Sequence, residues 1–214
     1  MTIDAPSDAA APVGIPQLRL VRTLGRLCVA TALMASIFLG TWELAHPVFG
    51  GGAGRYTLTP ASAVQLWAYG ILQALKPLGF LAGLFGIYFG GTRRNIVLKG
   101  VLGLAAAGGV FYAIVWIMIA VTGRDDAVYL AGRAIGSDAR TNGGVFFLWL
   151  APIVLGVGAL LARRVPRWQA VWLMGTGFLG SRLFGALPVG VALVVEGILW
   201  YTVGMIAVSA ERGA

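Results

Sequence analysis

The sequence predicts an all-α fold: a polytopic membrane helix bundle of about six transmembrane helices, with both termini in the cytoplasm. First, 58% of the residues are hydrophobic and only 11% are charged, whereas soluble domains carry about 25% charged residues. Second, the hydrophobic residues gather in runs near the ~20 residues that a helix needs to cross a bilayer. Third, basic residues cluster at alternate ends of these runs. The weak alternation of membrane β-strands is absent from the sequence.

The apolar runs between polar breaks predict the transmembrane helices. The fifth run is short, and the stretch after it is barely polar, so a re-entrant hairpin or a tight external turn is the alternative there. The predicted helices are Leu27–Ala45, Leu66–Phe89, Gly100–Val121, Val145–Leu161, Trp168–Phe184 and Leu187–Val208.

The chain divides into a tail and one transmembrane domain. Residues 1–18 are rich in Ala, Pro and Asp and have no apolar face, which predicts a disordered cytoplasmic tail. Residues 19–210 form the single transmembrane domain. Within it, residues 122–143 form an external loop long enough for a short helix at Val128–Ile135. Paired carboxylates at positions 125 and 126 of this loop suggest a cation site, but a solvated loop balanced by its own arginines is the favoured interpretation.

The distribution of basic residues sets the predicted orientation, because short cytoplasmic segments are enriched in Lys and Arg. Only four basic residues fall in the connections that are predicted to lie outside the cell: Arg55, Arg124, Arg133 and Arg140. We therefore expect a multi-pass protein of the plasma (inner) membrane, and the Ala, Gly and Arg content favours a bacterial source. The ten basic residues on the predicted cytoplasmic side are Arg19, Arg22, Arg26, Arg93, Arg94, Lys99, Arg163, Arg164, Arg167 and Arg212.

Composition also excludes several classes of function. The net charge of +8 comes from clusters at helix ends rather than from one basic face, so we expect no nucleic-acid partner. A single cysteine and a single histidine do not provide the ligand sets of a haem, zinc or iron–sulfur site. The sequence therefore predicts no metal site within this chain alone and leaves any cofactor unknown.

Glycine is abundant, with 32 residues, and several glycines have small-xxx-small spacing. In lipid, such positions let helix backbones approach closely. Packing within the chain is the favoured interpretation, and packing between two copies is the alternative. The pairs are Gly79/Gly83, Gly86/Gly90 and Gly103/Ala107.

Four ionisable residues fall inside the predicted spans: Glu43, Lys76, Arg182 and Glu196. Each lies 15 to 17 residues from the basic residue that anchors its helix, which predicts one common layer of two positive and two negative charges. Charges inside the membrane normally face the bundle interior and find partners. The alternative is that two of them reach the interface by snorkelling while Lys76 and Glu196 form a structural ion pair.

A polar face of the second predicted helix leads towards this layer, since Gln65, Tyr69, Gln73 and Lys76 are spaced by four, four and three residues. Pro77 interrupts the helix beside the lysine, and His46 lies about one turn from Glu43. The sequence therefore predicts an outward-facing polar pocket. Its predicted ligand-binding residues are Glu43, His46, Gln73, Lys76, Arg182 and Glu196.

The small extramembrane mass favours a non-enzymatic role. We expect an accessory or scaffold subunit of a larger membrane complex, or a binder of lipid, pigment or another small ligand, with membrane lipids and other integral membrane subunits as partners. The alternative is a small secondary transporter or channel that uses the charged layer. An intramembrane enzyme is disfavoured, because no positioned nucleophile or metal completes a mechanism.

Overall fold

The computed structural model describes residues 15–46, 49–50, 57–58, 63–92, 96–122, 143–162 and 165–209. The helix expected at Val128–Ile135 and the carboxylates Asp125 and Asp126 lie outside these residues. Over the described part the chain is almost entirely helical, which confirms the all-α fold class.

Within the described ranges, helices form every element except one short strand pair. The first helical rod consists of α1 (Ile15–Thr31), the π-helical segment η1 (Ala32–Phe38) and α2 (Leu39–Ala45). The strands β1 (Phe49–Gly50) and β2 (Thr57–Leu58) pair antiparallel. The remaining elements are α3 (Ala63–Ile87), η2 (Tyr88–Thr92), α4 (Ile96–Thr122), α6 (Gly143–Ala162), α7 (Arg167–Ala186) and α8 (Val189–Ser209).

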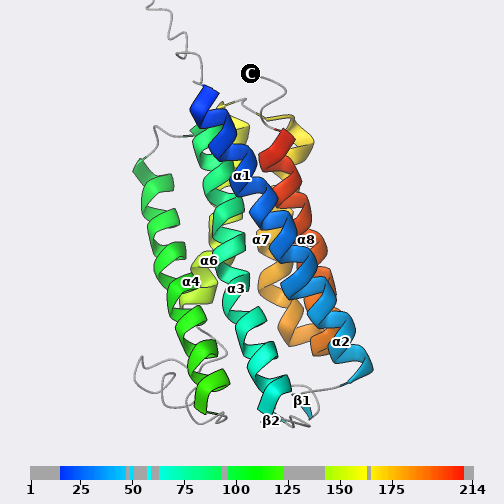
Figure 1. The fold of residues 1–214 in the computed structure, drawn as a ribbon. Coiled ribbons are helices and arrows are strands. Elements are labelled where there is room, and N and C mark those ends of the chain that lie inside the picture. Colours follow the sequence, from blue (N-terminus) through cyan, green and yellow to red (C-terminus); the bar gives the residue numbers. More distant parts are fainter. Residues whose placement is uncertain are drawn as a thin grey trace, which may run out of the picture.

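Successive helices run in opposite directions and give the bundle two ends (Figure 1). The first and last described residues, Ile15 and Ser209, lie at one end, which we call the terminal end. The strands β1 and β2 lie at the other end, which we call the hairpin end. Helix α3 is central and packs against α1, α4 and α8, while α6 packs against α4 and α7. The start of α1 and the end of α8 therefore lie at the same end of the bundle, which is compatible with the predicted topology.

Among the described residues, four helical stretches are long and apolar enough to cross a membrane, and α6 contains a shorter apolar stretch at Leu148–Leu161. Apolar helices of this length are compatible with an integral membrane protein, because each satisfies its own backbone hydrogen bonds in lipid. The count of about six crossings and the cytoplasmic orientation of the termini stay predictions. The four stretches are Gln17–Ala45, Trp67–Gly90, Ile96–Met118 and Val189–Ser209.

The first helix begins earlier than the sequence predicts. Residues 1–18 were expected to form a disordered tail, whereas α1 begins at Ile15. Pro16 is compatible with this start, because the N–H groups of a first helical turn have no partner in the helix. Val21 and Gly25 are buried one turn apart, so the helix already packs on the bundle before its apolar run begins. Residues 1–14 lie outside the described part of the chain.

The first helical rod and α8 approach each other at backbone contact distance. A Cβ atom on Gly25 would lie 2.9 Å from the carbonyl oxygen of Gly204, and a Cβ on Gly204 would lie 2.9 Å from that of Gly25. Gly40 and Gly190 form a second reciprocal pair, at 2.7 and 2.9 Å. Close-packed interiors do not tolerate side-chain atoms at these separations. The two glycine pairs therefore fix the register of α8 against the first rod.

The small-residue pairs on α3 and α4 have different surroundings. Gly79 and Gly83 face side chains of α1, and Gly86 faces α8, which confirms the predicted packing within the chain. Gly103, by contrast, has no atom within 4 Å of the position that a Cβ would occupy, and both Gly103 and Ala107 are exposed. The prediction of intrachain packing is wrong for this last pair, because their face of α4 points away from the bundle.

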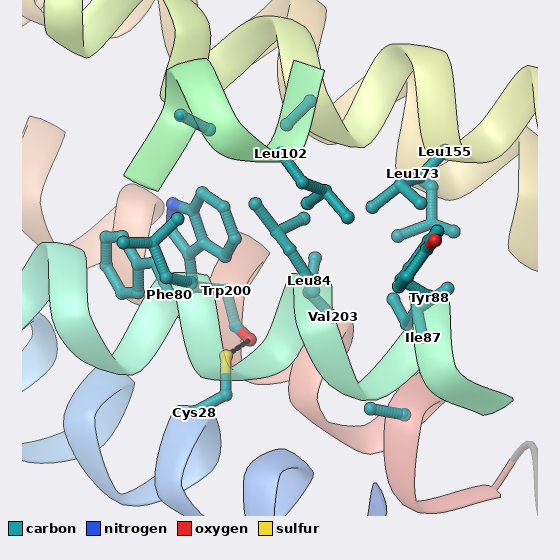
Figure 2. Close-up of a cluster of buried hydrophobic side chains, with 14 of the residues drawn as sticks. Cys28, Phe80, Leu84, Ile87, Tyr88, Leu102, Leu155, Leu173, Trp200 and Val203 are labelled. Atoms are coloured by element: carbon teal, nitrogen blue, oxygen red, sulfur yellow. Dashed lines mark hydrogen bonds between the residues drawn. The ribbon is translucent and has the colours of Figure 1, made fainter. Parts of the chain in front are cut away.

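The main apolar core packs side chains of α1, α3, α4, α6, α7 and α8 together (Figure 2). The rings of Phe80 and Trp200 stack with centroids 4.2 Å apart, and the Cys28 thiol donates to the Trp200 carbonyl oxygen at 3.3 Å. Leu84 and Leu155 are fully buried around them. In lipid, close packing of this kind stabilises helix association. It gives the polar residues one turn away a rigid base.

Replacing Gly40 by valine is expected to destabilise the protein, because the new Cβ would lie 2.7 Å from the Gly190 carbonyl oxygen. Overpacking of a well-packed site costs about 1–3 kcal/mol, so the thermal unfolding midpoint in detergent should fall. Gly103→Val is the matched control, since that site is open. Equal losses in the two variants would show that the contact between α2 and α8 does not require Gly40.

Candidate functional site

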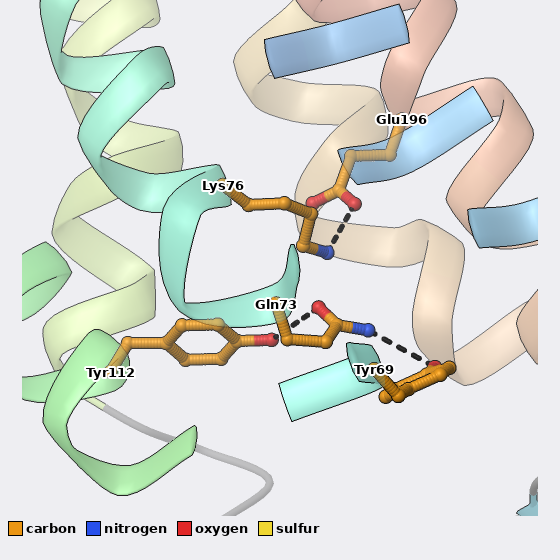
Figure 3. Close-up of polar contacts among 5 residues, drawn as sticks. All are labelled: Tyr69, Gln73, Lys76, Tyr112 and Glu196. Carbon is orange, nitrogen blue, oxygen red and sulfur yellow. Dashed lines mark hydrogen bonds and ion pairs between the residues drawn. The ribbon is translucent and has the colours of Figure 1, made fainter. Parts of the chain in front are cut away.

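A buried ion pair joins α3 to α8 (Figure 3). Lys76 Nζ lies 2.6 Å from Glu196 Oε2, and the two side chains are 3% and 5% exposed. Ser36 of η1 is fully buried, and η1 packs against Gly197, the neighbour of Glu196. The sequence predicts that Lys76 and Glu196 lie at one depth, and the structure brings them into direct contact.

The Lys76–Glu196 pair is more informative about function than about stability. Taking two charges out of water costs several kcal/mol per ion, and the attraction between them offsets this cost only with good geometry and further hydrogen bonds. Apolar residues of similar volume often give an equally stable interior. Ionisable groups among membrane helices commonly mark binding or ion pathways, so the pair identifies this region as the candidate site.

A separate series of hydrogen bonds near the ion pair joins α3 to α4 (Figure 3). The Tyr112 hydroxyl donates to Gln73 Oε1 at 3.4 Å, and Gln73 Nε2 donates to the Tyr69 hydroxyl oxygen at 3.0 Å. The first bond is long for a hydroxyl donor and is therefore the weaker of the two. The series therefore links Tyr112 of α4 to Tyr69 through Gln73, which lies three residues before Lys76 on α3.

Glu43 is a further buried ionisable side chain and is 4% exposed. Tyr69 packs with Leu39 and Leu193 in one buried cluster. Leu39 precedes Glu43 by one turn on the same face of α2, so Glu43 lies next to this cluster. We call the following residues the polar cluster: Ser36, Glu43, Tyr69, Gln73, Lys76, Tyr112 and Glu196.

Glu43 does not share the depth of the ion pair. The contact between Gly40 and Gly190 places Glu43 beside the beginning of α8, whereas Glu196 lies six residues past Gly190. Glu43 lies three residues beyond Gly40 in the opposite direction, so the two positions are about two and a half helical turns apart along the bundle, roughly 13 Å. The predicted common layer is wrong for Glu43, and the polar cluster has an outer part at the hairpin end and an inner part at the ion pair.

The difference in depth has a physical reason in the register of the two helices. The depth predicted from the sequence assumes that Arg26 and Arg212 anchor their helices at the same level of the membrane. The structure instead aligns Gly25, the neighbour of Arg26, with Gly204, which shifts the register by about two turns. A basic residue marks the interface only loosely, since its long side chain reaches the interface from several depths.

Irregular helix geometry flanks the ion pair on both sides. Pro77 lies inside α3 and has no N–H to bond the carbonyl of Gln73, four residues earlier. On the opposite side, η1 packs against Gly197, the residue after Glu196, and π-helical segments often occur at functional sites. Both helices that face Glu196 therefore depart from regular α-helix next to Lys76.

The remaining predicted site residues are His46 and Arg182, and neither is part of the contacts described above. His46 is exposed at the end of α2, with its ring centroid 5.0 Å from that of Trp42, about one turn beyond Glu43 towards the hairpin end. Arg182 belongs to α7, but its side chain lies outside the described part of the chain. The place of Arg182 in a charge network stays a prediction.

The predicted polar face of α3 is confirmed, since Tyr69, Gln73 and Lys76 are buried on it. Sequence reasoning missed Tyr112 and Ser36. Each is an isolated hydroxyl in an apolar run. Such groups tend to bond across helices in the interior of a membrane bundle, so this pattern could have identified both residues from the sequence. No protein-family model, curated protein or solved structure matches this chain.

Replacing Lys76 by methionine is expected to lower the thermal unfolding midpoint strongly, because the Glu196 carboxylate would stay buried without its ammonium partner at 2.6 Å. Breaking a buried pair on one side costs about 3–5 kcal/mol. The double variant Lys76→Met with Glu196→Gln should recover most of this loss, and Lys99→Met, at an exposed site on α4, is the control. Wild-type stability in the single variant would show that the pair is not held as a unit.

Proposed function

We propose that this chain is a small, non-enzymatic integral membrane protein that binds a small polar ligand at the polar cluster. The observation that carries the proposal is the composition of the polar cluster: two carboxylates, one ammonium, one amide and three hydroxyl groups lie buried or partly buried between apolar helices. Binding sites for small molecules similarly combine a largely apolar lining with a few converging polar groups.

The extent of the polar cluster supports binding over a purely structural role. A structural ion pair is complete with Lys76 and Glu196, yet the polar groups continue through Gln73 and Tyr69 to Glu43. Burying polar groups is unfavourable unless each is hydrogen-bonded, so a bundle that needs only stability gains little from this extension. Exposed His46 is one turn from Glu43, which makes the hairpin end the nearest route for a ligand.

Secondary transport is a second candidate, and the irregular helix geometry favours it. Pro77 in α3 and the π-helical segment η1 both lie beside the ion pair. Transporter sites are typically formed where membrane helices are interrupted, because the interruption frees backbone groups and lets the helix ends move. In this mechanism Lys76 and Glu196 would separate and pair again as the helices bend.

The sequence also predicts an accessory or scaffold role in a larger membrane complex. Such a role would use the exposed apolar faces of the helices rather than the polar cluster. Co-purification of the same partner subunits with the wild type and with variants of the polar cluster would support it.

Ligand binding is tested by purifying the wild type and the Lys76→Met, Glu196→Gln double variant from native membranes in mild detergent. Mass spectrometry and an absorption spectrum should detect a small molecule that accompanies the wild type and is missing from the double variant, because the charged partners of the ligand are gone. Lys99→Met should retain it. Identical small molecules in all three preparations, or none, would contradict the proposal.

Transport is tested in proteoliposomes that contain a pH-sensitive dye. With an imposed proton gradient, the wild type should show a proton flux above that of protein-free liposomes, and Glu196→Gln should reduce the flux to that background, because a neutral side chain at this position no longer forms the ion pair. Lys99→Met is the control for reconstitution. A flux that Glu196→Gln leaves unchanged would exclude the ion pair from the transport pathway.

A further inference from the structure

Three arginines lie on one exposed face of α1. Arg19, Arg22 and Arg26 are separated by three and four residues, so at about 100° per residue they lie within roughly 60° of one another around the helix axis. All three are exposed, whereas Val21 and Gly25 on the opposite side of the helix are buried in the bundle. We call Arg19, Arg22 and Arg26 the basic face of α1.

The basic face lies where a membrane helix meets the lipid headgroups. Helix α1 begins at Ile15, at the terminal end of the bundle (Figure 1), and its apolar stretch of membrane-spanning length begins at Gln17. Side chains of a helix lean towards its N-terminus, so the guanidinium groups reach back from the apolar stretch towards the terminal end. The rise from Arg19 to Arg26 is about 10 Å, comparable with the polar zone of one leaflet, about 5–8 Å.

The described part of the terminal end carries positive charge only. Glu43 and Glu196 are the only acidic side chains among the described residues, and both belong to the polar cluster rather than to this end. Like charges on neighbouring turns of a helix repel each other. The first turn of α1 also contains no acidic residue that would offset the positive end of the helix dipole. An anion bound at the basic face would reduce both unfavourable effects.

The apolar surface next to the basic face indicates that this anion is a lipid. Ala30 follows Arg26 by one turn on the same face and is exposed. Larger apolar side chains are exposed on the neighbouring turns: Leu27, Leu33 and Met34. A small side chain between larger ones lets an acyl chain lie close to the helix backbone. A soluble anion would use the arginines alone, whereas a phospholipid fits both the charged and the apolar part of this surface.

We propose that the basic face of α1 binds an anionic phospholipid of the surrounding membrane, with the phosphate beside the three arginines and an acyl chain along Ala30. Arginine suits this role because its planar guanidinium group donates two parallel hydrogen bonds to a phosphate. The site is on the exposed side of α1 and shares no residue with the polar cluster. The inference therefore goes beyond the proposed ligand site and depends only on the location of the helices in a membrane.

Native mass spectrometry of the full chain in detergent, titrated with phosphatidylglycerol, tests the headgroup contacts. The wild type should bind one phosphatidylglycerol more tightly than phosphatidylcholine with the same acyl chains. An arginine near an anionic lipid surface contributes about fivefold in affinity, so the double variant Arg19→Gln, Arg26→Gln should raise the dissociation constant on the order of 20-fold.

The matched control is the double variant Lys99→Gln, Arg167→Gln, which removes the same charge from exposed positions near the starts of α4 and α7. It should leave the dissociation constant nearly unchanged. Equal losses in the two double variants would mean that binding follows net charge, and equal affinities for the two lipids would mean that it ignores charge. Either result would overturn the proposal.

Competition distinguishes a lipid headgroup from free phosphate. Inorganic phosphate in large excess should displace little phosphatidylglycerol from the wild type, because it has no acyl chain to contact the apolar part of the site. Complete displacement by phosphate would show that the arginines form a site for the free anion, and the assignment to a lipid would be wrong.

The acyl-chain contact is tested by Ala30→Phe. The larger side chain should weaken phosphatidylglycerol binding several-fold while the arginines stay in place, and Ala107→Phe, at an exposed alanine of α4, should not. Both changes are at exposed positions, and the circular dichroism spectrum checks that each variant folds. Wild-type binding in Ala30→Phe would rule out an acyl chain on this face of α1.

The lipid site and the polar cluster can fail separately. A small molecule that is lost from the Lys76→Met, Glu196→Gln double variant, together with phosphatidylglycerol binding that no α1 variant changes, would overturn the lipid site alone. Selective phosphatidylglycerol binding, with no small molecule in any preparation, would contradict ligand binding at the polar cluster alone.

Discussion

The position of Lys76 opposite Glu196 is the constraint on which the rest of the structure depends. Two charges placed among apolar helices must meet, since each alone would be strongly unfavourable in lipid. The same separation of 120 residues relates Lys76 to Glu196 and Phe80 to Trp200, whose rings stack one turn farther along. One register of α3 against α8 therefore satisfies the ion pair and the core together. A slip by one residue would separate both, because it would turn each side chain away from its partner by about 100°.

The glycines of α8 also fix the position of this helix, through their contacts with the first helical rod. Gly190, Gly197 and Gly204 recur every seven residues, and each meets backbone atoms of the first helical rod. A seven-residue repeat keeps one seam of a helix against its neighbour, as in left-handed helix packing. Glu196 is adjacent to Gly197, so the carboxylate lies beside one of the points where the two backbones meet. The irregular segment η1 lies on the same seam, which places the least regular part of the first rod beside the best-fixed charge.

The helices and part of the site follow from local patterns in the sequence, whereas their relative depth does not. Apolar runs located each helix, and the spacing of Tyr69, Gln73 and Lys76 identified the buried face of α3. The depth of Glu43 depends instead on which glycines meet across α1, α2 and α8, a pairing between distant segments that no local count contains. Tyr112 was missed for a related reason: one hydroxyl in an apolar run has no periodicity, and only packing against Gln73 shows its role.

The exposed outer face of α4 has a consequence for the polar cluster. Tyr112 reaches the cluster from one side of this helix, while Val97, Gly103 and Ile114 on the other side are exposed and would contact lipid acyl chains. A membrane helix adjusts its tilt to the thickness of the surrounding bilayer. The long bond between Tyr112 and Gln73 is thus the contact most directly sensitive to bilayer thickness, so lipid composition becomes a variable that acts on the buried charges without touching them.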